Sequence, residues 1–251
     1  MTWLEQVAVF GAGVVAGAIN TIVGSGTLLT FPTLLAFGYP PVVANVSNTV
    51  GLVPGSASGA WGYRRELAGQ GRRLIRLGLA SGIGGLSGGL LLLVLPASAF
   101  KDIVPALIIL ACLLVVLQPA ITRRMEERGR KAPAADGGLL LLAGLFAAGL
   151  YGGYFGAAQG VLLMGIMGLT LREDIQRINA AKNVLAAIVN GVAAVLFIVV
   201  AHVAWRPALL LAAGSILGGQ IGARTGRRLP AGVLRTIIVI VGIVAVVRLL
   251  G

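Results

Sequence analysis

Two glycine-rich segments, 20–27 and 151–160, interrupt long apolar stretches of the sequence. Glycine permits backbone angles that other residues avoid, so each segment predicts a bend, and a bend within an apolar stretch must line a cavity. A helix that starts after such a bend offers unpaired N–H groups and a partial positive charge, which suit an oxyanion without any metal. The alternative is that the glycines only allow close helix packing. The candidate anion ligands in the bends are Asn20, Gly24, Ser25, Gly26, Thr27, Gly156 and Gln159.

A second group of polar residues lies on two otherwise apolar segments. Asn45 and Asn48 are three residues apart and Thr49 is adjacent to Asn48, so a helix over 41–62 places them on one face, where they offer amide and hydroxyl donors. Polar side chains in such a helix need a wet or protein-lined interior, and Pro54 predicts a kink or break in it. The segment near 178–203 carries a corresponding set, Asn179, Lys182 and Asn183.

Lys182 is the most specific of these candidates. It lies about one turn into an apolar span, where an ionisable residue is a functional hypothesis by default, and its ammonium would give an anion a fixed positive charge. The alternative is that its long stem reaches the membrane surface. Asn190 lies two turns further in, too deep to reach the surface, and is expected to line the interior.

Enzyme chemistry has little support in the sequence. His202 is the one histidine and Cys112 the one cysteine, so there is no metal-ligand spacing, no disulfide framework and no histidine–carboxylate pair. The Gly-x-Ser-x-Gly elbow of serine hydrolases has a glycine two residues before its serine, whereas Val23 stands two residues before Ser25. The eight acidic residues lie at span ends or in connections, so a buried carboxylate relay is not expected. We predict no enzyme activity and no cofactor or metal.

The composition indicates that most of this chain lies in a lipid bilayer. Of 251 residues, 57% are apolar and 11% are charged, with a mean hydropathy of +0.96, whereas about a quarter of residues are charged in soluble domains. Uncharged stretches run over 6–63, 137–171 and 183–205, and about 20 apolar residues suffice for one membrane-spanning helix. The 20 basic residues sit mostly in short gaps between apolar runs, which is a topology signal and does not indicate nucleic-acid binding.

Two similar series of elements follow from the apolar runs. The first has a long element over 7–38 and spans near 41–62, 74–95 and 103–119, and the second has a long element over 138–170 and spans near 178–203, 207–223 and 232–249. The loop Leu95-Pro96-Ala97 returns as Leu229-Pro230-Ala231, 134 positions later, and the glycines Gly78 and Gly82 correspond to Gly214 and Gly218. We therefore predict a first membrane repeat over 1–120, a basic linker over 121–137 and a second repeat over 138–251.

The distribution of Lys and Arg predicts the orientation. Basic residues gather at 64–76, in the central linker, at 172–182 and at 224–235, which should all be cytoplasmic. The long elements then begin and end on one side, so each is a re-entrant hairpin, and both termini lie outside. The fold expected is an all-α polytopic membrane protein made of two inverted-topology repeats, with eight to ten membrane segments. Such repeats often form a transport site at the bilayer midplane.

Three motifs resemble the sulfite exporter TauE/SafE family. They are PPVVANVSNT at 40–49, GYRREL at 62–67 and RINAAKN at 177–183, and their order along the whole chain is more specific than any one of them. The resemblance implies transport of sulfur-containing anions such as sulfite, thiosulfate or organosulfonates, often as export. The second bend has Ala157-Ala158-Gln159 where the family often has further glycine, which suggests an asymmetric site with Gln159 as a direct ligand.

These observations predict a transporter of a small sulfur-containing anion in the cytoplasmic membrane, with the anion and the lipid bilayer as its partners and with no nucleic acid. Two alternatives remain open. One is a transporter of another organic anion or of a metal complex, and the other is a membrane receptor or assembly protein. The sequence does not fix the oligomeric state, the direction of transport or the coupling ion.

Overall fold

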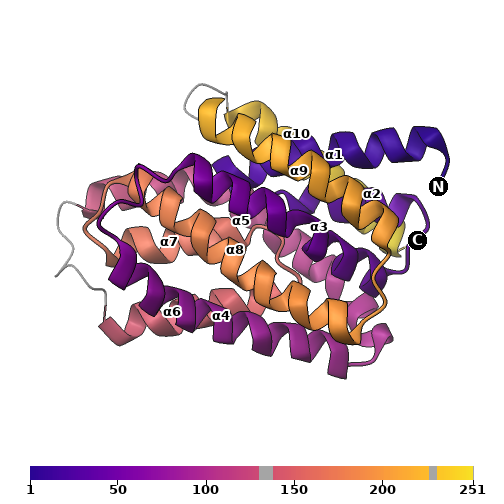
Figure 1. The fold of residues 1–251 in the computed structure, drawn as a ribbon, viewed down its shortest axis with the longest axis horizontal. Helices are drawn as coiled ribbons and strands as arrows, with labels where there is room; N and C mark the ends of the chain where they lie inside the picture. The colour runs from indigo at the N-terminus through magenta and orange to yellow at the C-terminus, as the bar shows by residue number, and fades with distance from the viewer. Residues whose placement is uncertain (130–137, 226–230, 251) are drawn as a thin grey trace.

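The computed structural model describes residues 1–129, 138–225 and 231–250, which form ten helices (Figure 1). The predicted all-α class is confirmed, because the described residues contain helices and connections and no strand. The helices are α1 (Trp3–Ile22), α2 (Thr27–Ala36), α3 (Pro41–Gly62), α4 (Gly71–Val94), α5 (Ala97–Gly129), α6 (Gly138–Tyr154), α7 (Gln159–Thr170), α8 (Ile175–Val200), α9 (Trp205–Thr225) and α10 (Ala231–Leu250).

Most helices begin and end close to the predicted limits, and two predictions need adjustment. Helix α5 continues to Gly129, so the first nine residues of the predicted linker 121–137 are helical, and 130–137 lie outside the described residues. Arg123 and Glu127 pair at 3.9 Å one turn apart on α5, with side chains 78% and 68% exposed, so this last part of the helix is polar. Helix α3 continues through Pro54 without a break in its assignment.

The lengths and faces of the helices fit a membrane. Four described segments are long and apolar enough to cross one, namely Trp3–Ile22, Gly71–Val94, Ala97–Arg124 and Ile175–Val200. Large apolar side chains also cover the outer surface, as Ile75, Leu79 and Ile83 do along one face of α4. Contiguous apolar patches of this kind are rare on soluble monomers. The chain is a multi-pass membrane protein.

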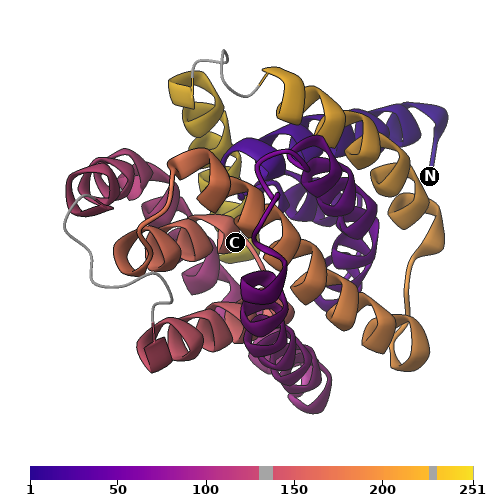
Figure 2. The ribbon, with the colours of Figure 1, turned by 60° about the vertical axis from the view of Figure 1, so that its left-hand side comes forward.

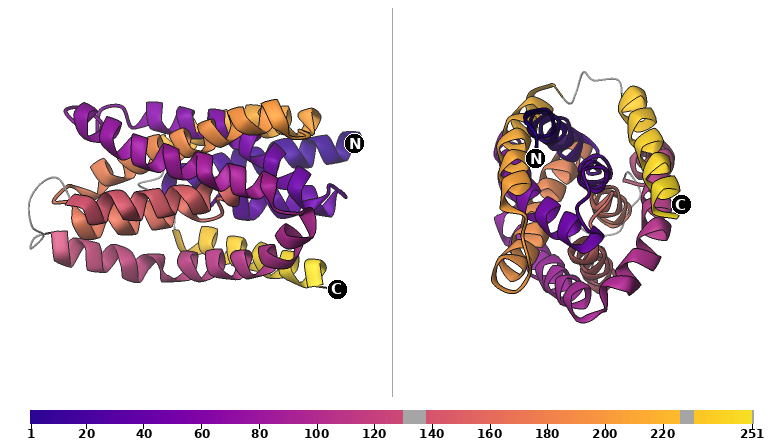
Figure 3. Two further views of the ribbon diagram at one scale, coloured as in Figure 1. Left: turned by 90° about the horizontal axis from the view of Figure 1, so that it is seen from below. Right: turned by 90° about the vertical axis from the view of Figure 1, so that its right-hand side faces the viewer.

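Helix contacts recur in the two halves of the chain. Helix α1 packs on α9 as α6 packs on α4, α3 packs on α9 as α8 packs on α4, and α2 packs on α10 as α7 packs on α5. Helices α3 and α8 also pack on each other, and Figure 3 shows the long helices running side by side. Figure 2 gives a second view of the same bundle. This recurrence supports the repeat hypothesis, while the inverted relation of the halves stays a prediction.

Glycines allow the closest of these contacts. A Cβ on Gly84 or Gly88 of α4 would overlap backbone carbonyls of α6, and a Cβ on Gly218 of α9 would overlap the carbonyl of Val14 on α1. Close backbone approach through small residues is the usual means of helix packing in membranes. Gly78 and Gly82 instead lie against Ile188 of α8. Gly84 and Gly88 are therefore the α4 glycines that pack as the α9 glycines do.

The two ends of the molecule differ in charge. The N-terminus and the end of α10 lie at one end, whereas α5 ends and α6 begins at the other, to the left in Figures 1 and 3. Most of the described arginines lie at this second end, which we call the basic end; they are Arg64, Arg65, Arg72, Arg73, Arg76, Arg123, Arg124, Arg172 and Arg177.

We predict that Gly88→Ala lowers the thermal unfolding temperature in detergent by several degrees, because overpacking typically costs about 1–3 kcal/mol. Gly191→Ala on α8 is the matched control: a Cβ there meets nothing within 4 Å, and alanine favours helix over glycine. Equal unfolding temperatures for the two variants would show that α4 and α6 are not in close backbone contact.

Candidate functional site

Both predicted bends are present, and the helices before them end in the same way. The helices after them start differently, since Gly26 before α2 has a φ of -58° and Ala158 before α7 has a φ of 57°. In each bend, the last two N–H groups of the turn donate to one carbonyl, Ile19 O in the first bend and Tyr151 O in the second. The second of these donors is a glycine in both bends, Gly24 and Gly156, with φ angles of 87° and 77°. Glycine in this left-handed region ends a helix at little cost. The glycine pattern therefore stops α1 and α6 inside the molecule and turns the chain into α2 and α7.

The two bends touch each other at a pair of glycines. The N–H of Gly160, in the first turn of α7, donates to Gly24 O at 3.0 Å. A Cβ on either glycine would overlap the Cα of the other. The bends can meet only while both positions lack side chains, and their contact brings the two halves of the chain together at the centre of the site.

The start of α2 presents free hydrogen-bond donors at this contact. Leu28 N and Leu29 N donate to Ser25 O and Gly26 O, whereas the N–H groups of Ser25 and Gly26 have no acceptor among the described residues. The Ser25 hydroxyl is 1% exposed and is also without a partner there. Buried polar groups are nearly always satisfied, so unpaired donors in one place indicate a position that a ligand or water fills.

The end of α1 is held by three side chains of α8. Lys182 Nζ donates to Asn20 O and Thr21 O, both at 3.0 Å. Asn183 Nδ2 and Asn179 Nδ2 donate to Thr21 O at 3.3 and 3.5 Å. The last carbonyls of a helix lack intrahelical partners and carry a partial negative charge. The three predicted residues therefore meet, and they cap α1.

Lys182 is fully buried, so its stem does not reach the membrane surface. The described acidic residues lie in connections or within two turns of a helix end, and Lys182 donates to neutral carbonyls. Its stem passes Gly160, since a Cβ there would lie 3.1 Å from Lys182 Cδ. The Lys182 amino group thus sits beside the contact between the bends, with no carboxylate partner among the described residues.

The polar residues of α3 join both bends. Asn45 Nδ2 donates to Tyr154 O, at the end of α6, at 2.9 Å, as Asn179 does to the end of α1. Asn48 bonds to the hydroxyls of Thr27 and Thr30 on α2. Thr49, predicted as a ligand, donates to the carbonyl of Asn45 at 3.0 Å within its own helix. Helix α3 therefore bonds to the hairpins α1–α2 and α6–α7 through its side chains, as α8 does. The amide of Asn48 on α3 takes the position that the amino group of Lys182 has on α8.

Gln159, a predicted ligand in the second bend, has a side-chain amide that remains unpaired. It is 3% exposed, its Nε2 has no partner among the described residues, and its amide lies over Gly152, where a Cβ would overlap it. Asn45 Oδ1 and Asn179 Oδ1 are likewise buried without a partner there. Amide orientation is assigned from such contacts, so these groups can turn either a donor or an acceptor towards a ligand.

Two predicted residues lie at the margin of the site. Asn20 Nδ2 donates to Ser56 Oγ at 3.0 Å, and Asn190 is half-buried on α8 two turns beyond Lys182. Sequence reasoning missed Thr30, which follows Thr27 by three residues and so shares its helix face. It also missed Tyr154, whose hydroxyl is buried and unpaired among the described residues. The spacing of Thr30 was a usable signal, whereas Tyr154 lay within a run of glycines and aromatics.

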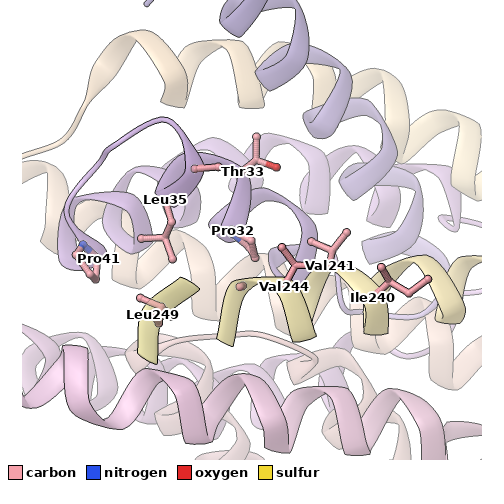
Figure 4. Close-up of a pocket in the computed structure, with 10 residues that line it drawn as sticks. Pro32, Thr33, Leu35, Pro41, Ile240, Val241, Val244 and Leu249 are labelled. Atoms are coloured by element: carbon pink, nitrogen blue, oxygen red, sulfur yellow. The ribbon is translucent and has the colours of Figure 1, made fainter. Parts of the chain in front are cut away.

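A groove of about 620 Å³ lies away from the bends, between α2 and α10 (Figure 4). Its lining is apolar except for Thr33, whose hydroxyl donates to Leu29 O at 2.7 Å. Val244, on its α10 side, is 54% exposed. The groove thus offers no free donor to an anion and is not part of the candidate site.

Comparisons with known proteins agree with this architecture. The model of the sulfite exporter TauE/SafE family matches residues 9–249. The probable membrane transporter protein ORF9 of Sinorhizobium sp. is 30% identical over 248 residues, covering 96% of this chain and 90% of that protein. The probable membrane transporter protein YfcA of Escherichia coli K12 is 29% identical over 242 residues, covering 96% and 88%. No solved structure matches the chain. The chain belongs to the sulfite exporter TauE/SafE family and is a membrane transporter.

Proposed function

We propose that this transporter carries small sulfur-containing anions, such as sulfite, thiosulfate or organosulfonates, in a site formed by the two bends and the start of α8. The observation that carries the proposal is the buried amino group of Lys182, which donates to the carbonyls of Asn20 and Thr21. A buried charge without a counter-charge is costly. An anion bound at the bends supplies the missing negative charge.

The donors around the bends fit the shape of an oxyanion. An oxyanion presents several acceptor oxygens, and the unpaired donors at the start of α2 are the Ser25 hydroxyl and the N–H groups of Ser25 and Gly26. Gln159 Nε2 adds a donor from the other bend. Helix N-termini favour negative charge for the same reason. The description of the family, which names sulfite, supports sulfur among the possible oxyanions.

The arrangement in the membrane is part of the proposal. Two inverted repeats place the bends near the bilayer midplane, as in many secondary transporters. Arginines gather at the basic end, so this end faces the cytoplasm and the N-terminus faces outside. We place the protein in the cytoplasmic membrane, with each substrate anion passing between the hairpins α1–α2 and α6–α7.

Flux measurements in liposomes test the function. We expect purified protein to move sulfite, thiosulfate or sulfoacetate, and we expect Lys182→Met to lower flux at subsaturating substrate at least tenfold, because loss of about 1.4 kcal/mol of binding is tenfold. Lys101→Met, which removes an exposed lysine in the first turns of α5, should retain flux. Chloride and phosphate serve as control anions. Transport of another organic anion alone would support the alternative substrate class, and absence of any flux would contradict the proposal.

Ser25→Ala separates binding from folding. The Ser25 hydroxyl has no partner among the described residues, so its removal should leave the unfolding temperature unchanged in the absence of substrate. It should weaken thiosulfate binding about threefold to tenfold, in line with about 0.5–1.5 kcal/mol for one hydrogen bond. Ser87→Ala, on α4 away from the bends, is the control. Unchanged affinity in Ser25→Ala would place the anion elsewhere.

A further inference from the structure

A carboxylate at the basic end is held between two arginines from different halves of the chain. Glu173 lies in the connection between α7 and α8, where Arg73 Nη1 of α4 contacts its Oε2 at 2.6 Å and Arg177 Nε of α8 contacts its Oε1 at 2.7 Å. The side chains of Glu173, Arg73 and Arg177 are 18%, 21% and 32% exposed, so the group is half-buried and reachable from water.

The second arginine is held in place by backbone on both sides. Arg177 Nη2 donates to Ala68 O at 3.1 Å, and the buried side chain of Gln70 reaches the carbonyls of Glu66 and Arg177 at 2.8 and 3.5 Å. These bonds connect the turn between α3 and α4 to the first turn of α8. The Arg177 guanidinium therefore has support that does not depend on Glu173.

The two guanidiniums form a cradle for an oxyanion. Arginine binds carboxylate and other planar or tetrahedral oxyanions through the same N–H groups. Burial raises the pKa of the Glu173 carboxyl, but the hydrogen bond from Arg73 and the charge of Arg177 outweigh this and hold the pKa below its usual value. Glu173 is thus ionised at neutral pH, and the three groups together retain one positive charge.

The cradle lies near the site at the bends, along helix α8. Arg177 is five residues before Lys182 on the same helix, a rise of about 7.5 Å. At the other end of α8, the connection to α9 is held on α3 by a hydrogen bond from Ala204 N to Ser47 Oγ at 2.9 Å, between uncharged groups. The ionic contact between the halves is therefore a feature of the basic end.

We propose that Arg73 and Arg177 form a second anion-binding site at the basic end, which the Glu173 carboxylate occupies until a transported oxyanion displaces it. The site receives the anion at the membrane surface, and α8 connects it to Lys182. This inference rests on the proposed function for its substrate class, and its chemistry requires only a small oxyanion that carries at least one negative charge.

Thiosulfate titration calorimetry of purified protein tests the site in a Lys182→Met background, in which the binding site at the bends is impaired. We expect addition of Glu173→Gln to strengthen thiosulfate binding at least tenfold, since the tethered competitor loses its charge, and further addition of Arg73→Gln to abolish the gain. Glu127→Gln is the matched control, because it removes an exposed acid paired with an arginine at the same end. The control should not change the affinity.

Equal affinity with and without Glu173→Gln would overturn the second site and leave a purely structural ion pair. If Glu173→Gln does not fold, Glu173→Asp tests the same point: its shorter side chain should contact the arginines less closely and give a smaller gain, and no gain would overturn the site. Protein with Lys182 intact separates the two proposals. Lys182-dependent binding without an effect of Glu173→Gln contradicts only the second site, whereas absence of Lys182-dependent binding contradicts the proposed function.

Discussion

The carbonyls at the broken ends of α1 and α6 are the constraint around which the rest of the molecule is arranged. A helix that stops inside a membrane leaves its last carbonyls without partners, and hydrocarbon offers none. Asn179, Lys182 and Asn183 supply donors to the end of α1, and Asn45 supplies one to the end of α6. Helices α3 and α8 must therefore lie beside the bends. The glycines that allow close contact of α4 with α6, and of α9 with α1, let the outer helices pack closely enough for α3 and α8 to reach the bends.

The two halves satisfy this constraint differently, and the difference has chemical consequences. Where α8 has Lys182, the corresponding position of α3 is Asn48, which bonds to hydroxyls of α2. One half thus contributes a charge and the other a neutral amide. An oxyanion in such a site meets a positive charge from one side and dipolar donors from the other. Asymmetry of this kind arises from one residue type, although both hairpins turn at a glycine with positive φ, Gly24 and Gly156.

Parts of this arrangement were predictable because they depend on local sequence. Gly24 and Gly156 marked the bends, since positive φ has a direct residue signature, and Lys182 was conspicuous as a charge in an apolar span. The partners of Lys182 were not predictable, because they are backbone carbonyls, which every residue has. Helix α5 exceeded its predicted length because charged residues such as Arg123 end an apolar run but do not end a helix. The match of Gly78 and Gly82 to Gly214 and Gly218 did not identify Gly84 and Gly88 as the glycines that meet α6, because sequence spacing alone does not tell which face of a helix meets which neighbour.

In the proposed site, Lys182 caps α1 and binds an anion at the same time. An ammonium has three N–H donors, and the two carbonyls of α1 account for two of them. The third N–H can reach a ligand oxygen without loss of the cap. An anion near the ammonium also interacts with the same charge that holds the end of α1, so binding and the position of this hairpin are linked through one side chain. A lysine whose charge was neutralised by a carboxylate would keep the cap but lose the link, which gives a physical reason for the absence of acidic residues from the described parts of α1, α2, α7 and α8 beyond their terminal turns.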